Sequence, residues 1–147
     1  MKLNENSKIL IVGLGLIGGS YAEALSQKGY EIGAIDAKKQ SIDFALAKGW
    51  IKQGRTDVEE KFVSAYDIVI FALYPHVFVE WIEKYQSYFK SGALITDVTG
   101  VKGSVVDKVQ SILRKDVEFV PAHPMAGRET SGIEGANAQI FRDANYI

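Results

Sequence analysis

The stretch KILIVGLGLIGGS, residues 8–20, decides the fold of this chain. The apolar run 9–12 predicts a buried strand, and it leads into Gly13, Gly15 and Gly18 at G-x-G-x-x-G spacing. A helical pattern follows at once, and this order of strand, glycine turn and helix indicates a dinucleotide site. Gly13 suits the tight turn, Gly15 has no Cβ to hold a pyrophosphate away, and Gly18 lets the helix lie close to the strand.

An acidic residue follows a second strand-like run. Asp36 directly follows residues 31–35, near the offset expected for the acid that binds an adenosine ribose. A carboxylate there accepts hydrogen bonds from both ribose hydroxyls and repels a 2′-phosphate, which favours NAD over NADP. Lys38 and Lys39 follow directly and keep NADP open, because either ammonium could reach a 2′-phosphate. The alternative is a glycine-rich turn beside a chance aspartate, which fits the combination of strand, helix and acid less well.

Composition describes an ordinary globular protein. The 147 residues fit a single domain, with 47% hydrophobic and 24% charged residues. A net charge of -1 gives no electrostatic footprint for nucleic acid or an anionic membrane. The absence of cysteine excludes disulfides and cysteine-ligated zinc, and no metal site is predicted. Without a signal peptide or an apolar run long enough to cross a bilayer, the expected location is the cytoplasm.

The rest of the chain alternates strand-like and helix-like segments. The expected strands are residues 9–12, 31–35, 68–73, 94–98 and 118–121. The expected helices are residues 18–28, 39–48, 57–64, 78–89, 104–113 and 137–142, while 50–54 is ambiguous. This alternation predicts an α/β fold with a doubly wound, mostly parallel sheet, and residues 1–147 form one dinucleotide-binding domain.

Ligands of such sheets bind outside the carboxyl ends of the strands. The unusual segments of the chain all follow a strand and should meet at that edge: the glycine turn, Asp36, Tyr74-Pro75-His76, residues 97–103 and residues 122–129. The predicted cofactor-binding residues are Gly13, Gly15, Leu16, Ile17, Gly18, Asp36, Leu73, Tyr74 and Pro75.

Two histidines are the candidates for proton transfer. His123, in a stiff turn before a proline, could accept a proton from a hydroxyl as hydride leaves the substrate, or it could be a hydrogen-bonded loop residue. His76 begins an amphipathic helix and is expected at the surface. Asp97, at the end of a strand, is expected to accept hydrogen bonds from backbone N–H groups of the following turn.

Three motifs read together resemble one family. GLGLIGGS (13–20), DVTGVK (97–102) and HPMAG (123–127) resemble the nucleotide-binding domain of the prephenate and arogenate dehydrogenases. The resemblance implies NAD-dependent oxidative decarboxylation of prephenate to 4-hydroxyphenylpyruvate, in tyrosine biosynthesis. His123 matches the family's catalytic histidine, and Glu129 matches a loop acid that helps to order the substrate pocket. Thr99-Gly100 stands where the family has Gly-Ser, so either Thr99 or a water is expected to supply the missing hydroxyl.

The family continues beyond the length of this chain into a helical domain that completes the substrate pocket and dimerises. The resemblance therefore implies that this chain is the cofactor half of a longer protein, which acts as a homodimer on a small-molecule substrate. Alternatives remain open: an enzyme that uses arogenate or NADP, a β-hydroxyacid dehydrogenase, and a non-catalytic NAD(H)-binding regulatory module. The His-Pro-Met-Ala-Gly turn argues against the β-hydroxyacid dehydrogenases, which place a catalytic lysine in a following helical domain.

Overall fold

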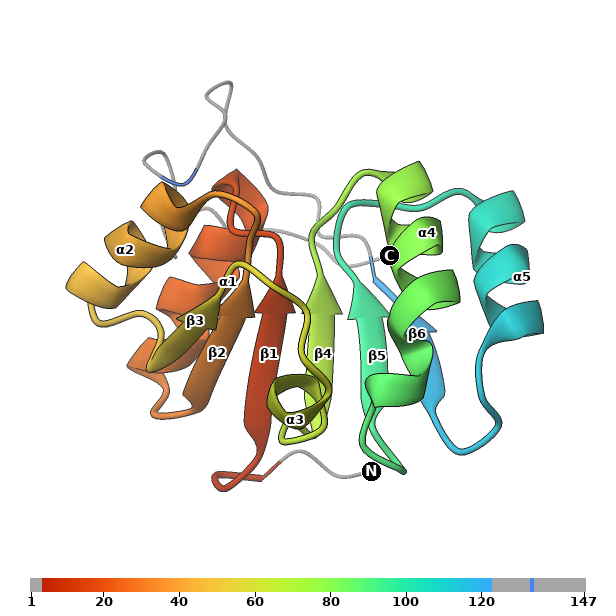
Figure 1. The fold of residues 1–147 in the computed structure, drawn as a ribbon, viewed down its shortest axis with the longest axis horizontal. Helices are drawn as coiled ribbons and strands as arrows, with labels where there is room; N and C mark the ends of the chain where they lie inside the picture. The colour runs from red at the N-terminus through yellow and green to blue at the C-terminus, as the bar shows by residue number, and fades with distance from the viewer. Residues whose placement is uncertain (1–3, 123–132, 134–147) are drawn as a thin grey trace.

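The computed structural model describes residues 4–122 and Ile133, and its centre is a single parallel sheet (Figure 1). The strands lie in the order β3-β2-β1-β4-β5-β6. The strands are β1 (Lys8–Val12), β2 (Glu31–Ile35), β3 (Gln53–Arg55), β4 (Ile68–Phe71), β5 (Leu94–Asp97) and β6 (Glu118–Pro121). The helices are α1 (Leu16–Gln27), α2 (Lys39–Ala47), α3 (Glu60–Val63), α4 (Pro75–Tyr85) and α5 (Gly103–Ile112), and a 3₁₀ turn, η1 (Gln86–Tyr88), follows α4.

The direction of winding reverses between β1 and β4. From β1 the chain adds β2 and β3 on one side, and it then returns to place β4, β5 and β6 on the other. β1 is thus paired on both edges: Ile9 lies opposite Ile32 of β2 and opposite Ile68 of β4. Because every pairing among these strands is parallel, their carboxyl ends share one edge of the sheet. The doubly wound fold predicted from the sequence is confirmed.

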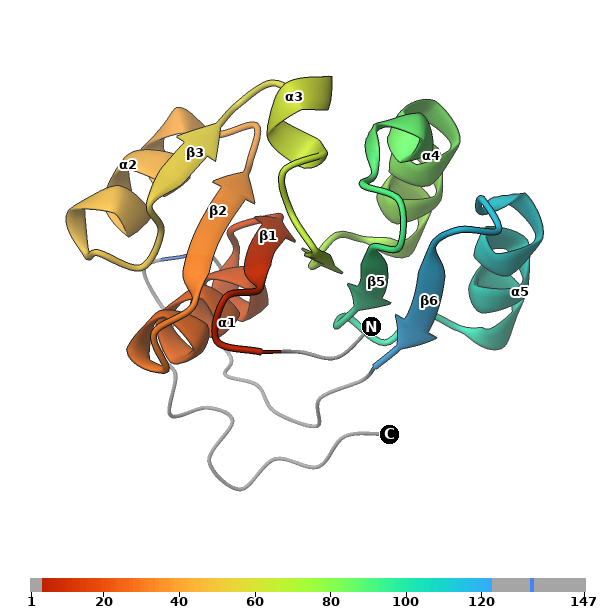
Figure 2. The same cartoon turned by 90° about the horizontal axis from the view of Figure 1, so that it is seen from below.

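Successive side chains of the central strand point to opposite faces of the sheet, and each face has its own apolar layer. On β1, Ile9 and Ile11 pack toward α1 and α2, whereas Leu10 and Val12 pack toward α3, α4 and α5. Figure 2 shows α1 and α4 on opposite sides of the sheet. Burial on both faces explains why β1 and β4 read as unbroken apolar runs in the sequence.

Three segments differ most from the prediction. The ambiguous stretch after α2 contributes β3, whose three polar and glycine residues form a strand by pairing with β2. α3 spans four residues rather than eight, because Glu59 is still in an extended conformation. α4 stops at Tyr85, although Phe89 continues its aromatic stripe and is buried.

Arg114 explains the early end of α4. Its guanidinium donates hydrogen bonds to the carbonyl oxygens of Gln86 (3.2 Å) and Phe89 (2.8 Å), which hold the chain in a turn there. The Gln86 side chain also accepts from the Arg114 N–H and donates to the Ile112 carbonyl. The predicted helix at 137–142 lies outside the described residues. Within the described part of the chain, no helix is both long and apolar enough to cross a membrane.

Candidate functional site: a pocket at the glycine turn

The three motif glycines have different structural roles. Gly13 has a φ of +101°, a conformation that favours glycine, and a Cβ there would lie 2.4 Å from the Ala72 carbonyl oxygen. A Cβ on Gly18 would lie 1.7 Å from the Gly13 carbonyl oxygen, so helix α1 can approach the turn only with glycine at this position. Around Gly15, in contrast, no atom of the described residues beyond its chain neighbours lies within 4 Å of the Cβ position. Packing therefore requires Gly13 and Gly18, whereas Gly15 faces open space.

Asp36 is held rigidly against the same turn. Its Oδ2 accepts a hydrogen bond from the Leu14 N–H (2.7 Å), and its Oδ1 accepts one from the Lys38 N–H (2.8 Å). A carboxylate has about four lone-pair sites, so both oxygens keep capacity for a ligand's hydroxyl groups. The Lys39 ammonium pairs with Asp43 one helical turn away (3.1 Å). These contacts place a fixed negative charge beside the glycine turn.

The turn, Asp36 and the loop after β4 enclose a pocket of about 470 Å³, here called the glycine pocket. Its lining includes every residue predicted to bind the cofactor, together with Thr99. It also includes Ala72 and Val77, which the sequence reasoning missed because small apolar residues near a strand end carry no distinguishing signal. The amino-terminal end of α1 opens at this pocket, so the backbone N–H groups of its first turn and the helix dipole favour an anion there.

The end of β5 borders the glycine pocket and contains a buried carboxyl group. Asp97 has no exposed surface, and its Oδ2 accepts hydrogen bonds from the N–H groups of Thr99 (3.2 Å) and Val101 (3.3 Å). The expectation that Asp97 bonds to the turn after it is confirmed. Burial raises the pKa of Asp97; hydrogen bonds from Thr99, Val101 and Gly100 act in the opposite direction, and the pKa stays above its ordinary value.

The two predicted histidines fare differently. His76 is exposed at the start of α4 and lies parallel to the Tyr74 ring, with centroids 6.4 Å apart, as expected for a surface residue. His123 and Glu129 lie outside the described residues, and their roles stay predictions. The last described residue before His123 is Ala122, whose N–H donates to the Asp97 carbonyl (3.0 Å). The chain therefore leaves β6 at the same edge of the sheet as the glycine pocket.

Ile133 also lies near this edge, and the sequence reasoning missed it. It is 2% exposed and packs in the apolar layer with Leu14 and Tyr21, on the face covered by α1. It also lines a small hollow beside Asp36 and Lys38. The available signal was a single isoleucine in an otherwise polar, glycine-rich stretch.

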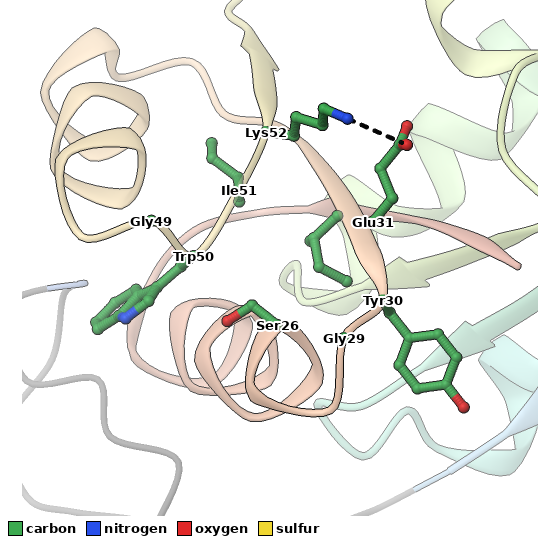
Figure 3. A pocket seen from close by; sticks show the side chains of 9 residues that line it. Ser26, Gly29, Tyr30, Glu31, Gly49, Trp50, Ile51 and Lys52 are labelled. Carbon is green, nitrogen blue, oxygen red and sulfur yellow. Dashed lines mark ion pairs between the residues drawn. The ribbon is translucent and has the colours of Figure 1, made fainter. Parts of the chain in front are cut away.

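A second hollow of about 470 Å³ lies at the opposite, amino-terminal edge of β2 (Figure 3). Figure 3 shows the Tyr30 and Trp50 rings directed away from each other, with Lys52 paired to Glu31. Glu31 pairs with Lys8 as well, so its charge is already compensated. The hollow lies at the carboxyl ends of α1 and α2, where the helix dipoles disfavour anions. Volume alone thus does not distinguish the two hollows, but the polar groups around them do.

Residues 21–147 match the family described as prephenate dehydrogenase, nucleotide-binding domain. The chain is 36% identical over 145 residues to the prephenate dehydrogenase of Bacillus subtilis, covering 95% of this chain and 38% of that protein. The structure of Aquifex aeolicus prephenate dehydrogenase in complex with hydroxyphenyl propionate and NAD+ superposes with a TM-score of 0.86, at 33% identity, over 95% of this chain and 49% of that one. Synechocystis arogenate dehydrogenase gives the same TM-score at 26% identity, over 95% and 48% of the two chains.

The match extends over most of this chain but over less than half of its relatives. The chain spans about two fifths of the length of the curated relatives it matches, 40% and 38%. By the family match over residues 21–147, this chain belongs to the prephenate dehydrogenase family, as its nucleotide-binding domain.

Proposed function

We propose that this chain binds NAD and forms the cofactor half of a dehydrogenase that converts prephenate to 4-hydroxyphenylpyruvate. One observation carries the cofactor assignment: the open glycine turn, the start of α1 and the fixed Asp36 carboxylate meet in a single pocket. The Aquifex relative, whose structure contains NAD+, supports the same assignment.

The lining residues fit the parts of a dinucleotide in sequence along the sheet edge. Asp36 would accept hydrogen bonds from the adenosine ribose, and the pyrophosphate would lie over Gly15 at the start of α1. The other half would then extend over the ends of β4 and β5, toward Leu73 and Thr99. When bound, NAD supplies the hydride acceptor.

The proposed reaction requires a group that removes the proton of the substrate's ring hydroxyl. Hydride leaves the carbon that bears this hydroxyl, CO2 is lost, and the ring becomes aromatic. Neutral His123 is the proposed base, since its ordinary pKa lies near working pH. Glu129 is proposed to help order the substrate pocket, and Thr99 to supply the hydroxyl group that the family has one residue later.

Arogenate is the second candidate substrate, because the Synechocystis arogenate dehydrogenase superposes as well as the prephenate enzyme. The two substrates differ by a keto or an amino group on the side chain. Prephenate is preferred on the higher identity, 33% against 26%. Dimer formation by the longer protein belongs to the same proposal, and sedimentation of that protein tests it.

Turnover by the full-length protein tests the reaction. We expect NADH formation with prephenate and NAD+, compared with arogenate and NADP+ as alternatives. His123→Asn should abolish turnover and leave the NAD+ dissociation constant within about twofold. A variant that keeps the wild-type rate would remove His123 from catalysis. Dinucleotide binding without turnover on either substrate would favour a regulatory module instead.

Nucleotide selectivity tests the role of Asp36. Asp36→Ala should weaken NAD+ binding about tenfold or more and shift the ratio of NAD+ to NADP+ affinity toward NADP+, because repulsion of the 2′-phosphate is lost. The matched control is Asp43→Ala, which removes an exposed carboxylate paired with Lys39 on α2. An unchanged ratio in Asp36→Ala would show that another residue selects the nucleotide.

A further inference from the structure

We propose that Asp97 is a positioning residue, which acts through the Thr99 hydroxyl to fix the β4–α4 loop along the nicotinamide half of the glycine pocket. The proposal rests on the proposed binding of NAD. It concerns a buried carboxyl group that the reaction does not use directly.

Asp97 connects three segments at the carboxyl edge of the sheet. Its side chain organises the turn after β5 through the N–H groups of Thr99 and Val101. Its carbonyl oxygen accepts from Ala122 at the end of β6. The third connection runs to the loop after β4: the Thr99 Oγ1 lies 2.9 Å from Asp97 Oδ1 and 2.9 Å from the Leu73 carbonyl oxygen.

The proton count defines the direction of this last connection. A threonine hydroxyl has one proton to donate and two lone pairs that accept. The Leu73 carbonyl can only accept, and an ionised Asp97 would compete with it for the single Thr99 proton. Two separate hydrogen bonds form at once when the Asp97 carboxyl carries a proton and donates it to Thr99. The chain of bonds then runs from Asp97 to Thr99 to Leu73. Burial raises the pKa of Asp97 and so favours the protonated carboxyl that this direction needs.

The acceptor at the end of the chain belongs to the pocket wall. Leu73, Tyr74 and Pro75 all line the glycine pocket, and Tyr74 is 77% exposed, so little packing fixes its side chain. The hydrogen bond from Thr99 to Leu73 therefore ties an open loop to the neighbouring strand. Because Asp36 lies at the other end of the pocket, loss of this tie should affect the nicotinamide half more than the adenosine half.

A comparison of NAD+ with ADP-ribose, which lacks nicotinamide, distinguishes binding in the nicotinamide half of the glycine pocket from binding in the adenosine half. Thr99→Val keeps the shape and removes the hydroxyl, and we expect about five- to tenfold weaker NAD+ binding with ADP-ribose within about twofold. Thr99→Ser should restore NAD+ binding. The matched control is Thr96→Val on β5, which removes a hydroxyl bond to the Val120 carbonyl (2.6 Å) and should change neither affinity.

Asp97→Asn tests the direction of the bonds. Its amide oxygen can accept the two backbone N–H groups, and its NH2 can donate to Thr99 as a protonated carboxyl does, so NAD+ binding should stay within about twofold of wild type. The amide resonance of Tyr74 gives a second readout, because its peptide bond contains the Leu73 carbonyl. It should shift in Thr99→Val and keep its wild-type position in Asp97→Asn.

Three results would overturn the proposal. In the first, Thr99→Val weakens both nucleotides equally, as a general loss of structure would do. In the second, it changes neither affinity. In the third, Asp97→Asn behaves like Thr99→Val. Failure of the wild-type chain to bind NAD+ at all is a distinct result, which rejects the proposed function and this inference with it.

Discussion

Alanine at Gly18 should destabilise the fold, and alanine at Gly15 should instead block binding. A Cβ at position 18 would lie 1.7 Å from the Gly13 carbonyl oxygen, so backbone must move by more than an ångström. Overpacking of this kind costs typically about 1–3 kcal/mol, and the clash with backbone places Gly18→Ala at the upper end. Alanine recovers up to about 1 kcal/mol of helix propensity, which leaves a net loss of about 2 kcal/mol.

At Gly15 the balance is reversed. Among the described residues the added Cβ meets nothing within 4 Å except its chain neighbours, and the conformation has a negative φ of -85°. The expected loss of stability is at most about 1 kcal/mol, because alanine is a poorer N-cap than glycine. The same Cβ would occupy the space proposed for the pyrophosphate, and NAD+ binding should weaken about a hundredfold or more.

Thermal unfolding and NAD+ titration calorimetry separate the two effects. A loss of about 2 kcal/mol corresponds to a Tm lower by about 4–8 °C for a domain of this size. Gly103→Ala is the control, since Gly103 begins α5 and, in the part of the chain that the structure describes, no atom outside its own helix and chain neighbours lies within 4 Å of its Cβ position. Gly18→Ala with wild-type stability, or Gly15→Ala with wild-type NAD+ affinity, would refute the reasoning from Cβ contacts.

Three further predictions concern stability and titration. Gly100→Ser, which restores the family's hydroxyl position, should cost about 1–2 kcal/mol in urea unfolding because Gly100 has a φ of +80°. Asp67→Asn should lower the free energy of unfolding by about 1–2 kcal/mol at neutral pH. Burial raises the pKa of Asp67, but hydrogen bonds and charges from Lys8 and Lys90 outweigh burial and lower this pKa below 3.8. The stabilisation by the carboxylate is therefore present above pH 3.8, and the difference in stability between wild type and Asp67→Asn should vanish as pH falls through the lowered pKa. Tyr66 should ionise with a midpoint near 12 when tyrosine absorbance is followed with pH, because burial, and then the charge of Glu31, raise its pKa to about 12. A midpoint near 10 for Tyr66 in the folded protein would contradict its buried position.

Patterns that are local in the chain predicted most elements. β2 and β6 have the predicted bounds, and the ends of β1, α1, α2 and α5 lie within about two residues of prediction. Long apolar runs and helical periodicity reflect burial directly, so these elements can be predicted from the sequence alone. β3 could not be predicted in this way, because Gln53–Arg55 has no apolar pattern and forms a strand through its pairing with β2. The end of α4 could not be predicted either, because it depends on a hydrogen bond to the Phe89 carbonyl from Arg114, which lies 25 residues further along the chain.

The sequence by itself determined the glycine turn, the acid after the second strand and the sheet edge at which they meet. These follow from short-range spacing and from the rule that parallel strands end at one edge. Only the tertiary structure decided that Gly18 touches Gly13, that Asp36 accepts the Leu14 N–H, and that Thr99 lies between Asp97 and Leu73. Such contacts join residues that different strands carry to the same edge. Their distances depend on how the strands pair and how closely the helices pack, which no local pattern contains.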